Sequence, residues 1–329
     1  MAKLNVGLIG CGSLGTGYHL EHLMKMKDVK VAAVCDVIQE RADVAGKKSG
    51  ANAYTDYKEM LEKEKLDACF VAVPPAEHPD IELGIISKKI NLHIQKPMTL
   101  SMEHAKKVEA AIKKTGIINA VGFQDRYLDV TEEIISFLKT RKTGLFRGAW
   151  LGGVPGVPWW QKKATCGGQI VEQNIHIYDM ARLFFGEPTR VSGAGGTGLL
   201  KQRKNAVPDY FDLEEYTSVN IEFKNGVIGN MLTGCYLKVY AKNGMDIFTE
   251  DGCVYYTLRR SAEFVSKNNK SLKIDVANDQ GFDCDRTFIE AVMKNDQSKI
   301  RSPYSDAIKT LKLTIAAQEA VETGKTIEL

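Results

Sequence analysis

Short apolar runs alternate with amphipathic stretches over the first part of the chain. The runs with the length and flanking turns of buried strands are residues 4–9, 29–35, 68–73, 92–94 and 117–121. Apolar positions recur at helical spacing between them, over residues 16–26, 38–49, 79–89 and 101–114. This alternation predicts an α/β fold in which a doubly wound parallel sheet is covered by helices on both faces.

The pattern changes after Phe123. A strand is expected over residues 146–151, and helical spacing is found over residues 131–140, 169–185 and 302–323. Much of residues 190–274 is typical of short strands separated by Asn-Gly and Asp-Gly turns. We therefore predict two domains, residues 1–122 and residues 123–329, of which the second is an α+β unit with an antiparallel sheet.

The first predicted strand leads directly into a glycine-rich sequence, Gly10-Cys11-Gly12-Ser13-Leu14-Gly15. G-x-G-x-x-G spacing between a strand and a helix is typical of a dinucleotide site: Gly10 permits a tight turn, Gly12 lets a pyrophosphate approach the main chain, and Gly15 lets the helix pack closely. The N–H groups at the start of that helix would face the phosphates. A plain turn in a domain without a cofactor is the alternative.

Asp36 ends the second predicted strand, 21 residues after Gly15. That spacing suits a carboxylate that hydrogen-bonds the adenosine ribose of a dinucleotide. Because a carboxylate there also repels a 2′-phosphate, the sequence favours NAD over NADP, although the nearby Arg41 weakens that preference.

Composition and charge narrow the choice of partner. The net charge is only +3, with acidic and basic residues interspersed, so we expect a small-molecule partner and no nucleic acid. The seven cysteines lack C-x-x-C spacing, which favours reduced, buried thiols in a cytoplasmic protein. The first strand begins at residue 4, so no signal peptide is expected, and no apolar run is long enough to cross a membrane.

Two loops that follow predicted strands contain candidate polar groups. Val73, Pro74 and Pro75 turn the chain at the ligand-binding edge of the sheet and are followed by His78, for which a surface position after a rigid turn is the alternative. Lys96 directly follows the strand at residues 92–94 and precedes a proline. Its ammonium is therefore expected to point into the cleft at the same edge.

A third candidate group lies on the helix predicted over residues 169–185. Glu172 and His176 are four residues apart, so one helix face would present both, with Asp179 close to the same stripe. A carboxylate beside an imidazole fixes its tautomer and raises its basicity, as general base catalysis requires. A surface ion pair is the plain alternative. We expect no metal site, because no third ligand is evident in a chain with six histidines.

Together these stretches resemble the glucose-fructose oxidoreductase, inositol dehydrogenase and MocA (Gfo/Idh/MocA) family over nearly the whole chain. The matching positions are residues 10–15, Asp36, residues 74–78, Lys96 with Pro97, residues 122–127, residues 167–172, His176, Asp179 and residues 316–327. The resemblance implies an N-terminal Rossmann domain that binds NAD or NADP. It also implies a C-terminal domain with a large, open, mainly antiparallel sheet that binds substrate and mediates oligomerisation.

The resemblance further implies roles for individual residues. It places the family's lysine at Lys96, near the nicotinamide and the reacting hydroxyl, its Asp or Asn at Glu172, and its catalytic histidine at His176. Gln95 departs from the family's glutamate and removes a negative charge beside Lys96, and Glu172 departs by its longer side chain. Further contacts to the cofactor are expected from Val73, Pro74, Pro75, His78, Gln95 and Gln124, and further contacts to substrate from Arg126, Trp159, Trp160 and Tyr236.

From these residues we predict NAD-dependent hydride transfer between nicotinamide and a secondary hydroxyl or ketone of a sugar, polyol or sugar derivative. His176 would accept the hydroxyl proton, Lys96 would stabilise charge on that oxygen, and Glu172 would orient His176 or hold a neighbouring hydroxyl. Trp159 and Trp160 suit stacking on a sugar ring, with packing in the interior as the alternative.

Two other functions stay open at this point. One is an NAD-dependent glycoside hydrolase that acts through transient oxidation, and the other is a non-catalytic, NAD-binding sensor. For all three functions the resemblance implies a homodimer or homotetramer that assembles through the C-terminal sheet.

Overall fold

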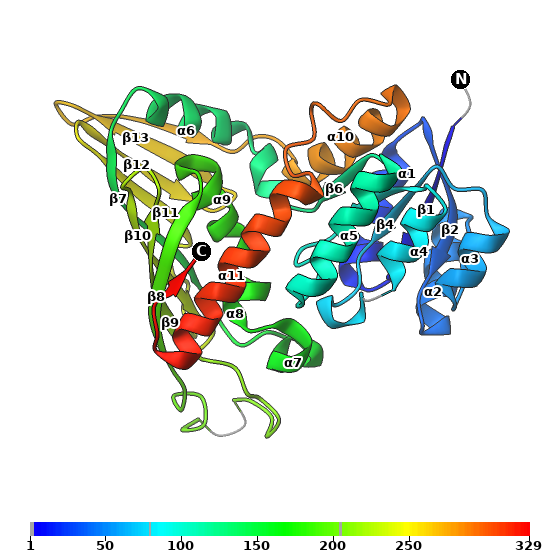
Figure 1. Ribbon diagram of the computed structural model, residues 1–329, viewed down its shortest axis with the longest axis horizontal. Coiled ribbons are helices and arrows are strands. Elements are labelled where there is room, and N and C mark those ends of the chain that lie inside the picture. The colour runs from blue at the N-terminus through cyan, green and yellow to red at the C-terminus, as the bar shows by residue number, and fades with distance from the viewer. Residues whose placement is uncertain (1–2, 79, 204–205) are drawn as a thin grey trace. The chain divides into compact units, whose positions relative to one another are not determined.

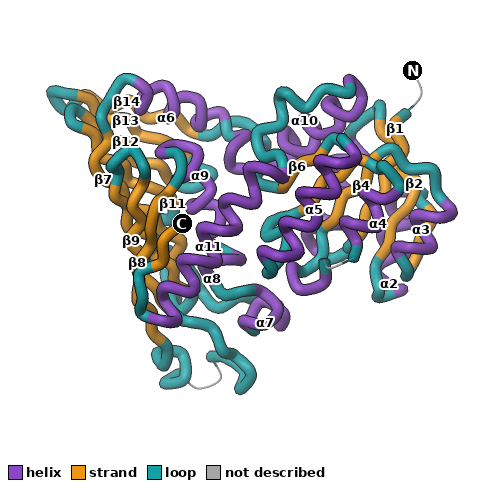
Figure 2. Tube along the Cα trace, in the orientation of Figure 1, coloured by secondary structure: helices purple, strands orange, loops and turns teal. Residues whose placement is uncertain are grey.

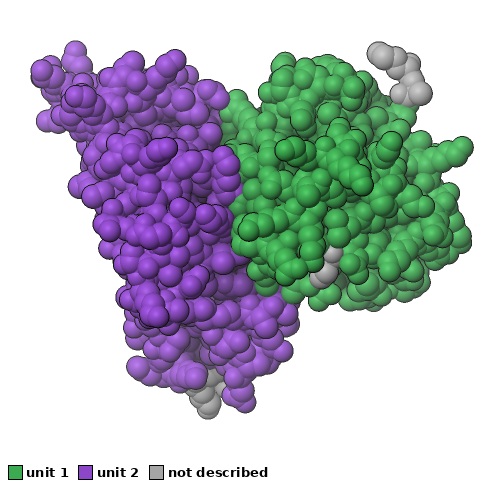
Figure 3. Space-filling view, viewed as in Figure 1, with its two compact units in different colours: residues 1–127, 279–308 green, residues 128–278, 309–329 purple. Residues whose placement is uncertain are grey.

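A computed structural model describes residues 3–78, 80–203 and 206–329 (Figure 1). The chain divides into two compact units, coloured separately in Figure 3: residues 1–127 with 279–308, and residues 128–278 with 309–329. The sequence predicted two domains that are each continuous in the chain. In the structure, residues 279–308 belong to the first unit although they follow most of the second. The physical reason is that this segment buries Phe288 and Ile289 in the apolar core of the first unit.

The first unit is built on a six-stranded sheet with the order β3-β2-β1-β4-β5-β6. Its strands are β1 (Leu4–Ile9), β2 (Val29–Cys35), β3 (Asn52–Tyr54), β4 (Ala68–Val71), β5 (Asn91–Ile94) and β6 (Asn119–Val121). All neighbouring strands pair in parallel, so their carboxyl ends share one edge. The strand order reverses at β1, which confirms the doubly wound parallel sheet and marks the edge where ligands bind.

Helices cover both faces of this sheet. They are the π-helix η1 (Gly15–His19), α1 (Leu20–Lys25), α2 (Gln39–Ser49), α3 (Tyr57–Lys63), α4 (Ile81–Ser87), α5 (Met102–Thr115) and α10 (Gln280–Lys294), with 3-10 turns η2 (Pro75–Glu77) and η3 (Gln124–Tyr127). Ser101 caps α5 by accepting a hydrogen bond from the His104 N–H, and Gly116 ends it with φ 69°. Pro79, the first residue of one expected helix, lies outside the described residues.

The second unit is built on a nine-stranded sheet with the order β14-β13-β12-β11-β7-β10-β9-β8-β15 (Figure 2). The strands are β7 (Thr143–Leu151), β8 (Pro188–Gly196), β9 (Tyr216–Phe223), β10 (Ile228–Gly234), β11 (Gly244–Thr249), β12 (Gly252–Thr257), β13 (Ser261–Ser266), β14 (Lys270–Asp275) and β15 (Ile327–Glu328). Among the described strands of this sheet, only β7 and β10 pair in parallel. The expected large, mainly antiparallel sheet is thus confirmed.

One face of the nine-stranded sheet is covered by helices. In Figure 1 these are α6 (Asp129–Lys139), the short α8 (Gln169–Glu172), α9 (Ile175–Phe185) and α11 (Tyr304–Thr323). The short α7 (Lys163–Cys166) and the 3-10 turn η4 (Pro158–Gln161) precede α8 and contact each other. Val219 and Ile221 alternate with exposed residues along β9 and pack with Ile177 and Met180 of α9 and Leu313 of α11 in one core. Among the described residues, no helix combines the length and apolarity needed to cross a membrane.

Candidate active site

The loops of the first unit's candidate site begin side by side at the carboxyl edge of its sheet. Main-chain hydrogen bonds align them: the Gly10 N–H donates to the Cys35 carbonyl over 2.8 Å, and the Ala72 N–H donates to the Ile9 carbonyl over 2.8 Å. The Gln95 N–H likewise donates to the Val71 carbonyl over 2.9 Å. The loops after β1, β2, β4 and β5 therefore start at one level, where the fold places ligands.

The three motif glycines meet different constraints. Gly10 has φ +95°, and a Cβ there would lie 2.4 Å from the Ala72 carbonyl oxygen. A Cβ on Gly15 would lie 1.8 Å from the Gly10 carbonyl oxygen, whereas one on Gly12 would meet nothing within 4 Å. The fold itself thus requires Gly10 and Gly15, while Gly12 leaves open space over exposed main chain. That space fits the approach of a dinucleotide pyrophosphate, with exposed Ser13 and Leu14 beside it.

Asp36 is held against the glycine loop by its own carboxylate. Its Oδ2 accepts a hydrogen bond from the Cys11 N–H over 2.8 Å, and its Oδ1 accepts one from the Ile38 N–H over 2.9 Å. The carboxylate therefore ties the end of β2 to the turn after β1 and stands where a ribose hydroxyl could donate to it. Burial, aided by the Asp36 charge, raises the pKa of Cys11 to about 12, so that thiol stays protonated. Arg41 lies exposed in the first turn of α2.

The loop after β4 differs from the expectation at His78. Val73 and Pro74 are half-buried and Pro75 is buried, but His78 is 0% exposed. Its Nδ1 lies 2.5 Å from Glu82 Oε1, and its Nε2 lies 3.1 Å from the Val73 carbonyl oxygen. The alternative of a surface histidine is therefore wrong. Because both ring nitrogens are used internally, the side chain supports the loop, and a contact to the cofactor stays a prediction.

Lys96 follows β5 and is partly exposed, whereas its neighbour Gln95 points inward. The Gln95 Nε2 lies 2.7 Å from His19 Nε2, and its Oε1 accepts a hydrogen bond from the Lys96 N–H over 3.2 Å. Gln95 thus supports the main chain of Lys96 from the interior, and its contact to the cofactor stays a prediction. Gln124, the remaining expected cofactor contact, is buried at the start of η3.

Arg126 was expected to bind substrate, and the structure assigns its guanidinium to other partners. The side chain is 4% exposed. Its Nη1 donates to the Arg301 carbonyl over 2.6 Å, and its Nη2 lies 2.7 Å from Asp306 Oδ2. A buried cation needs such partners, so Arg126 joins η3 to the C-terminal segment of the first unit. The structure thus gives Arg126 a structural role, and a contact to substrate stays a prediction.

The single helix expected over residues 169–185 is wrong, because α8 ends at Glu172 and α9 begins at Ile175. Asn174 interrupts the helix: its N–H donates back to the Gln169 carbonyl over 2.9 Å. Its side-chain amide donates to Thr233 Oγ1 over 2.7 Å, on β10. Glu172 and His176 therefore lie on two helices that Asn174 anchors to the sheet, and not on one face of a continuous helix.

Glu172 and His176 are both buried, each 4% exposed. The His176 ring stacks on Trp150 of β7, with centroids 5.8 Å apart and planes inclined by 28°. Burial raises the pKa of the nearby Cys166 to about 12, and the Glu172 charge contributes to that shift, so Cys166 is no nucleophile at neutral pH. Asp179 is 1% exposed and accepts a hydrogen bond from Thr310 Oγ1 of α11 over 2.7 Å.

The aromatic substrate candidates pack on a small satellite core of the second unit. Trp159 and Trp160 stack on each other with centroids 5.8 Å apart, and both pack against buried Leu200, Phe211 and neighbouring residues. Tyr236 contacts the same cluster. This arrangement provides the packing role that was the alternative for the tryptophans, and their half-buried rings leave the sugar-stacking role as a prediction.

A buried histidine cluster in the first unit was missed by the sequence analysis. His19, His22 and His93 surround Asp285 of α10, and none of the four is more than 4% exposed. Burial lowers the pKa of His93 to about 3. Burial alone would raise the pKa of Asp285, but the neighbouring histidines, His19 first, hold it well below its usual range. Only the His-x-x-His spacing at residues 19 and 22 hinted at this cluster.

Comparison with known protein families gives two matches. Residues 4–123 match the family described as "Oxidoreductase family, NAD-binding Rossmann fold". Residues 143–255 match the family described as "GFO/IDH/MocA C-terminal domain".

Similar proteins extend the match over most of the chain. Inositol 2-dehydrogenase of Pseudarthrobacter chlorophenolicus is 30% identical, over 76% of this chain and 73% of the relative. scyllo-Inositol 2-dehydrogenase (NAD(+)) of Bacillus subtilis is 24% identical, over 99% of this chain and 96% of the relative. The solved structure of levoglucosan dehydrogenase with NADH and levoglucosan has a TM-score of 0.86 at 18% identity, covering 99% of both chains.

Proposed function

The chain belongs to the Gfo/Idh/MocA family of NAD-binding oxidoreductases, and from that premise we propose that it oxidises a secondary hydroxyl of a sugar, polyol or sugar derivative, or reduces the corresponding ketone. Dehydrogenases of sugar and polyol hydroxyls are among its relatives. The names of those relatives, inositol and levoglucosan dehydrogenases, support a polyhydroxylated ring as the substrate.

The observation that supports this proposal most strongly is the burial of Glu172 and His176. Burying a carboxylate and an imidazole until each is 4% exposed costs free energy, and such groups concentrate at functional sites. Asn174, anchored to β10, and Trp150, stacked on His176, fix the segment that presents them. A buried imidazole of fixed orientation, with a carboxylate on the preceding short helix, suits removal of a hydroxyl proton.

The proposed chemistry assigns one task to each side chain. His176 accepts the proton of the reacting hydroxyl. Lys96 donates a hydrogen bond to the same oxygen and stabilises the negative charge that develops on it. Glu172 orients His176 or accepts a hydrogen bond from a neighbouring hydroxyl. When bound, NAD supplies the hydride acceptor.

The loop after β1 supports NAD as the cofactor. Gly12 leaves the main chain open to a pyrophosphate, and the Asp36 carboxylate, held by the Cys11 and Ile38 N–H groups, would accept from ribose hydroxyls. Because Asp36 would repel a 2′-phosphate, we propose a preference for NAD over NADP.

We further propose that the enzyme assembles as a homo-oligomer through the uncovered face of its nine-stranded sheet. Leu145 of β7 pairs in register with Ile228 of β10 and Phe248 of β11, and these three side chains are exposed by 56%, 47% and 38%. A row of exposed apolar side chains across neighbouring strands is typical of a protein interface. Leu145→Asp is expected to lower the molar mass measured by light scattering. The cytoplasmic location stays a prediction.

The decisive experiment measures NADH formation by absorbance when the full-length protein and NAD are mixed with inositols, sugars, sugar acids and glycosides. The proposal expects NADH and a ketone product in equal amounts with at least one polyol or sugar. Glycoside cleavage without net NADH would replace it with hydrolysis through transient oxidation. NAD binding without turnover of any compound would replace it with a sensor.

A further inference from the structure

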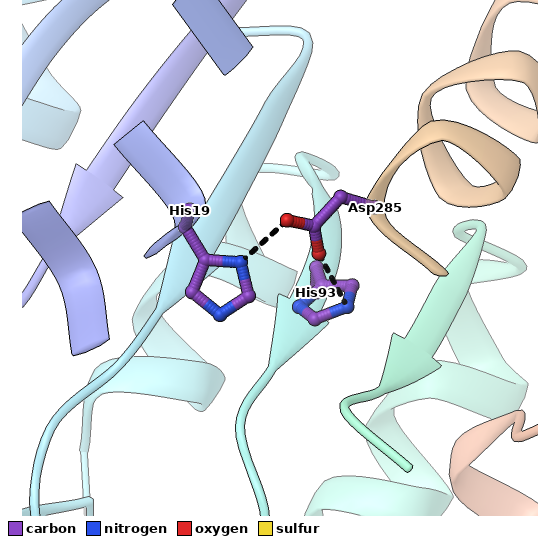
Figure 4. Close-up of side chains that lie close together, drawn as sticks. All are labelled: His19, His93 and Asp285. Atoms are coloured by element: carbon purple, nitrogen blue, oxygen red, sulfur yellow. Dashed lines mark hydrogen bonds and ion pairs between the residues drawn. The ribbon is translucent and has the colours of Figure 1, made fainter. Parts of the chain in front are cut away.

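The buried cluster around Asp285 brings together residues that are far apart in the sequence. His19 lies at the end of η1, His93 on β5 and Asp285 on α10, and their side chains are exposed by 1%, 0% and 1%. One ligand atom from each lies within 4.8 Å of the other two. Figure 4 shows the Asp285 carboxylate between the two rings, with one oxygen toward each.

Hydrogen bonds account for only one side of this carboxylate. His19 Nδ1 and His22 Nδ1 each lie 2.8 Å from Asp285 Oδ2. The other oxygen, Oδ1, has no hydrogen-bond partner among the residues that the structure describes. Its nearest imidazole nitrogen, His93 Nε2, lies 3.6 Å away, which is too far for a hydrogen bond.

Neither neutral tautomer of His93 resolves this arrangement. If Nε2 carries the proton, its N–H group fails to reach Asp285 Oδ1 across 3.6 Å. If Nδ1 carries the proton, the Nε2 lone pair faces a carboxylate oxygen, and the buried Nδ1 has no hydrogen-bond partner among the described residues. Cys284 Sγ lies 3.8 Å from the same Nε2 and offers only a weak contact. A cation between Nε2 and Oδ1 would satisfy both atoms in the second case.

The separation of His93 Nε2 and Asp285 Oδ1 suits a transition-metal ion. Zinc binds imidazole nitrogen and carboxylate oxygen at about 2.0–2.2 Å, so two ligands of one ion lie about 3–4 Å apart. The 3.6 Å separation of His93 Nε2 and Asp285 Oδ1 falls in this range, and His22 Nδ1, 2.8 Å from Oδ2, provides a fourth nearby donor. We propose that His19, His93 and Asp285 bind a divalent transition-metal ion, with Zn²⁺ as its representative.

The surroundings of the cluster support this site. The His93 ring is held by stacking on Phe70, with centroids 4.6 Å apart, so it presents Nε2 in a fixed direction. Gln95 lies 2.7 Å from the other nitrogen of His19, where ligating histidines commonly have an amide or carboxylate partner. To accept a hydrogen bond from that nitrogen, the Gln95 amide must turn over, which exchanges the 3.2 Å hydrogen bond from the Lys96 N–H for one from His19. The ion would join η1, β5 and α10 as a closed, structural site, independent of the proposed reaction.

A second buried histidine–carboxylate group in the same unit serves as an internal control. His78 uses both of its ring nitrogens, on Glu82 and on the Val73 carbonyl, so it has no lone pair for a metal. His104 Nε2 lies 3.7 Å from Glu82 Oε2 and is the remaining candidate ligand of this group. His104→Ala therefore removes a histidine near a buried carboxylate without touching the proposed site.

The test uses the full-length protein, its His93→Phe and Asp285→Asn variants and the His104→Ala control. Each is stripped with a chelator in urea, refolded with or without Zn²⁺, freed of excess ion and analysed for bound zinc and for its thermal midpoint. Refolding with the ion is included because the site is closed.

The proposal expects one Zn²⁺ per chain and a raised thermal midpoint in the wild type and in His104→Ala. His93→Phe and Asp285→Asn are expected to lose zinc affinity by at least about tenfold. Equal zinc content in all four proteins, or no zinc in the folded wild type, would overturn the proposal. If both site variants fail to fold, the wild type is refolded with Co²⁺ in place of Zn²⁺. The lack of a visible absorption band from bound Co²⁺ would then overturn the proposal.

Discussion

The glycine loop of the first unit and the α8–α9 segment of the second offer opposite kinds of chemistry. The loop presents main chain, because a Cβ at Gly12 would stand in open space and one at Gly15 would strike the Gly10 carbonyl. The α8–α9 segment presents buried side chains, Glu172 and His176, on helices interrupted at Asn174. A main-chain site depends on backbone conformation and therefore on the fold. A side-chain site can lose its chemistry while the fold persists.

Gly15→Ala should give the largest effect, because the added methyl group would clash with the backbone and destabilise the folded loop. Its Cβ would lie 1.8 Å from a backbone oxygen that cannot move aside cheaply. We expect a loss of about 3 kcal/mol or more in the free energy of unfolding, measured by urea denaturation. Gly17→Ala is the matched control, because a Cβ there meets nothing within 4 Å. Its urea midpoint should equal that of the wild type or lie slightly higher. Equal stability of the two variants would contradict the steric account.

His176→Ala tests the side-chain half of the comparison. The turnover number should fall by about a hundredfold or more, since the group proposed to accept the hydroxyl proton is removed. NAD binding, measured by fluorescence titration, and the thermal midpoint should change little. His104→Ala provides a histidine control that retains turnover. Wild-type turnover in His176→Ala would remove this residue from the mechanism.

Lys96→Met removes the ammonium and keeps much of the length of the side chain. Turnover should fall by about a hundredfold, because charge on the substrate oxygen would lose its stabilising donor. Lys88→Met, at an exposed position of the same unit, is the matched control. If Lys96→Met raises only KM and leaves kcat unchanged, Lys96 binds substrate without assisting the chemical step.

Gly12→Ala sharpens the contrast within the glycine motif. A Cβ at Gly12 meets nothing within 4 Å, so the urea midpoint should stay close to that of the wild type. NAD binding should weaken by about tenfold or more, because the methyl group would occupy the approach of the pyrophosphate. Undiminished NAD affinity would show that the pyrophosphate does not pass over Gly12.

Asp36→Asn should give the smallest effect. It keeps an oxygen that can accept from the Cys11 N–H, the bond that Asp36 makes over 2.8 Å, but removes the negative charge. The ratio of NAD to NADP affinity should fall by about fivefold, equivalent to about 1 kcal/mol. The measurement is a pair of binding titrations, and an unaltered ratio would contradict the ribose role of Asp36.

Local patterns predicted much of the first unit. Strand periodicity located β1 and β2 to the residue, and the spacing of Gly10, Gly12 and Gly15 indicated a turn that the dihedral angles and clash distances explain. These successes share one cause, since apolar alternation and positive φ are requirements that a residue meets within its own short segment. Other features of this unit depended on packing: the sequence left a surface position open for His78, yet it is fully buried between Glu82 and the Val73 carbonyl.

The second unit shows where periodicity is insufficient. Helical spacing joined residues 169–185 into one helix, but the Asn174 amide pairs with Thr233 on a strand far along the chain. That tertiary hydrogen bond favours the interruption between α8 and α9, which the local sequence alone does not require. The structural partners of Arg126 in the first unit were not predicted for a similar reason, since Arg301 and Asp306 lie in a distant C-terminal segment.

By itself the sequence determined the doubly wound sheet, the glycine loop with Asp36, and the family to which the chain belongs. Only the tertiary structure decided that α10 joins the first unit and brings Asp285 against His19 and His93. The reason is physical: backbone conformation and amphipathic periodicity are encoded over a few neighbouring residues. The meeting of residues 19, 93 and 285 depends instead on which apolar faces pack together.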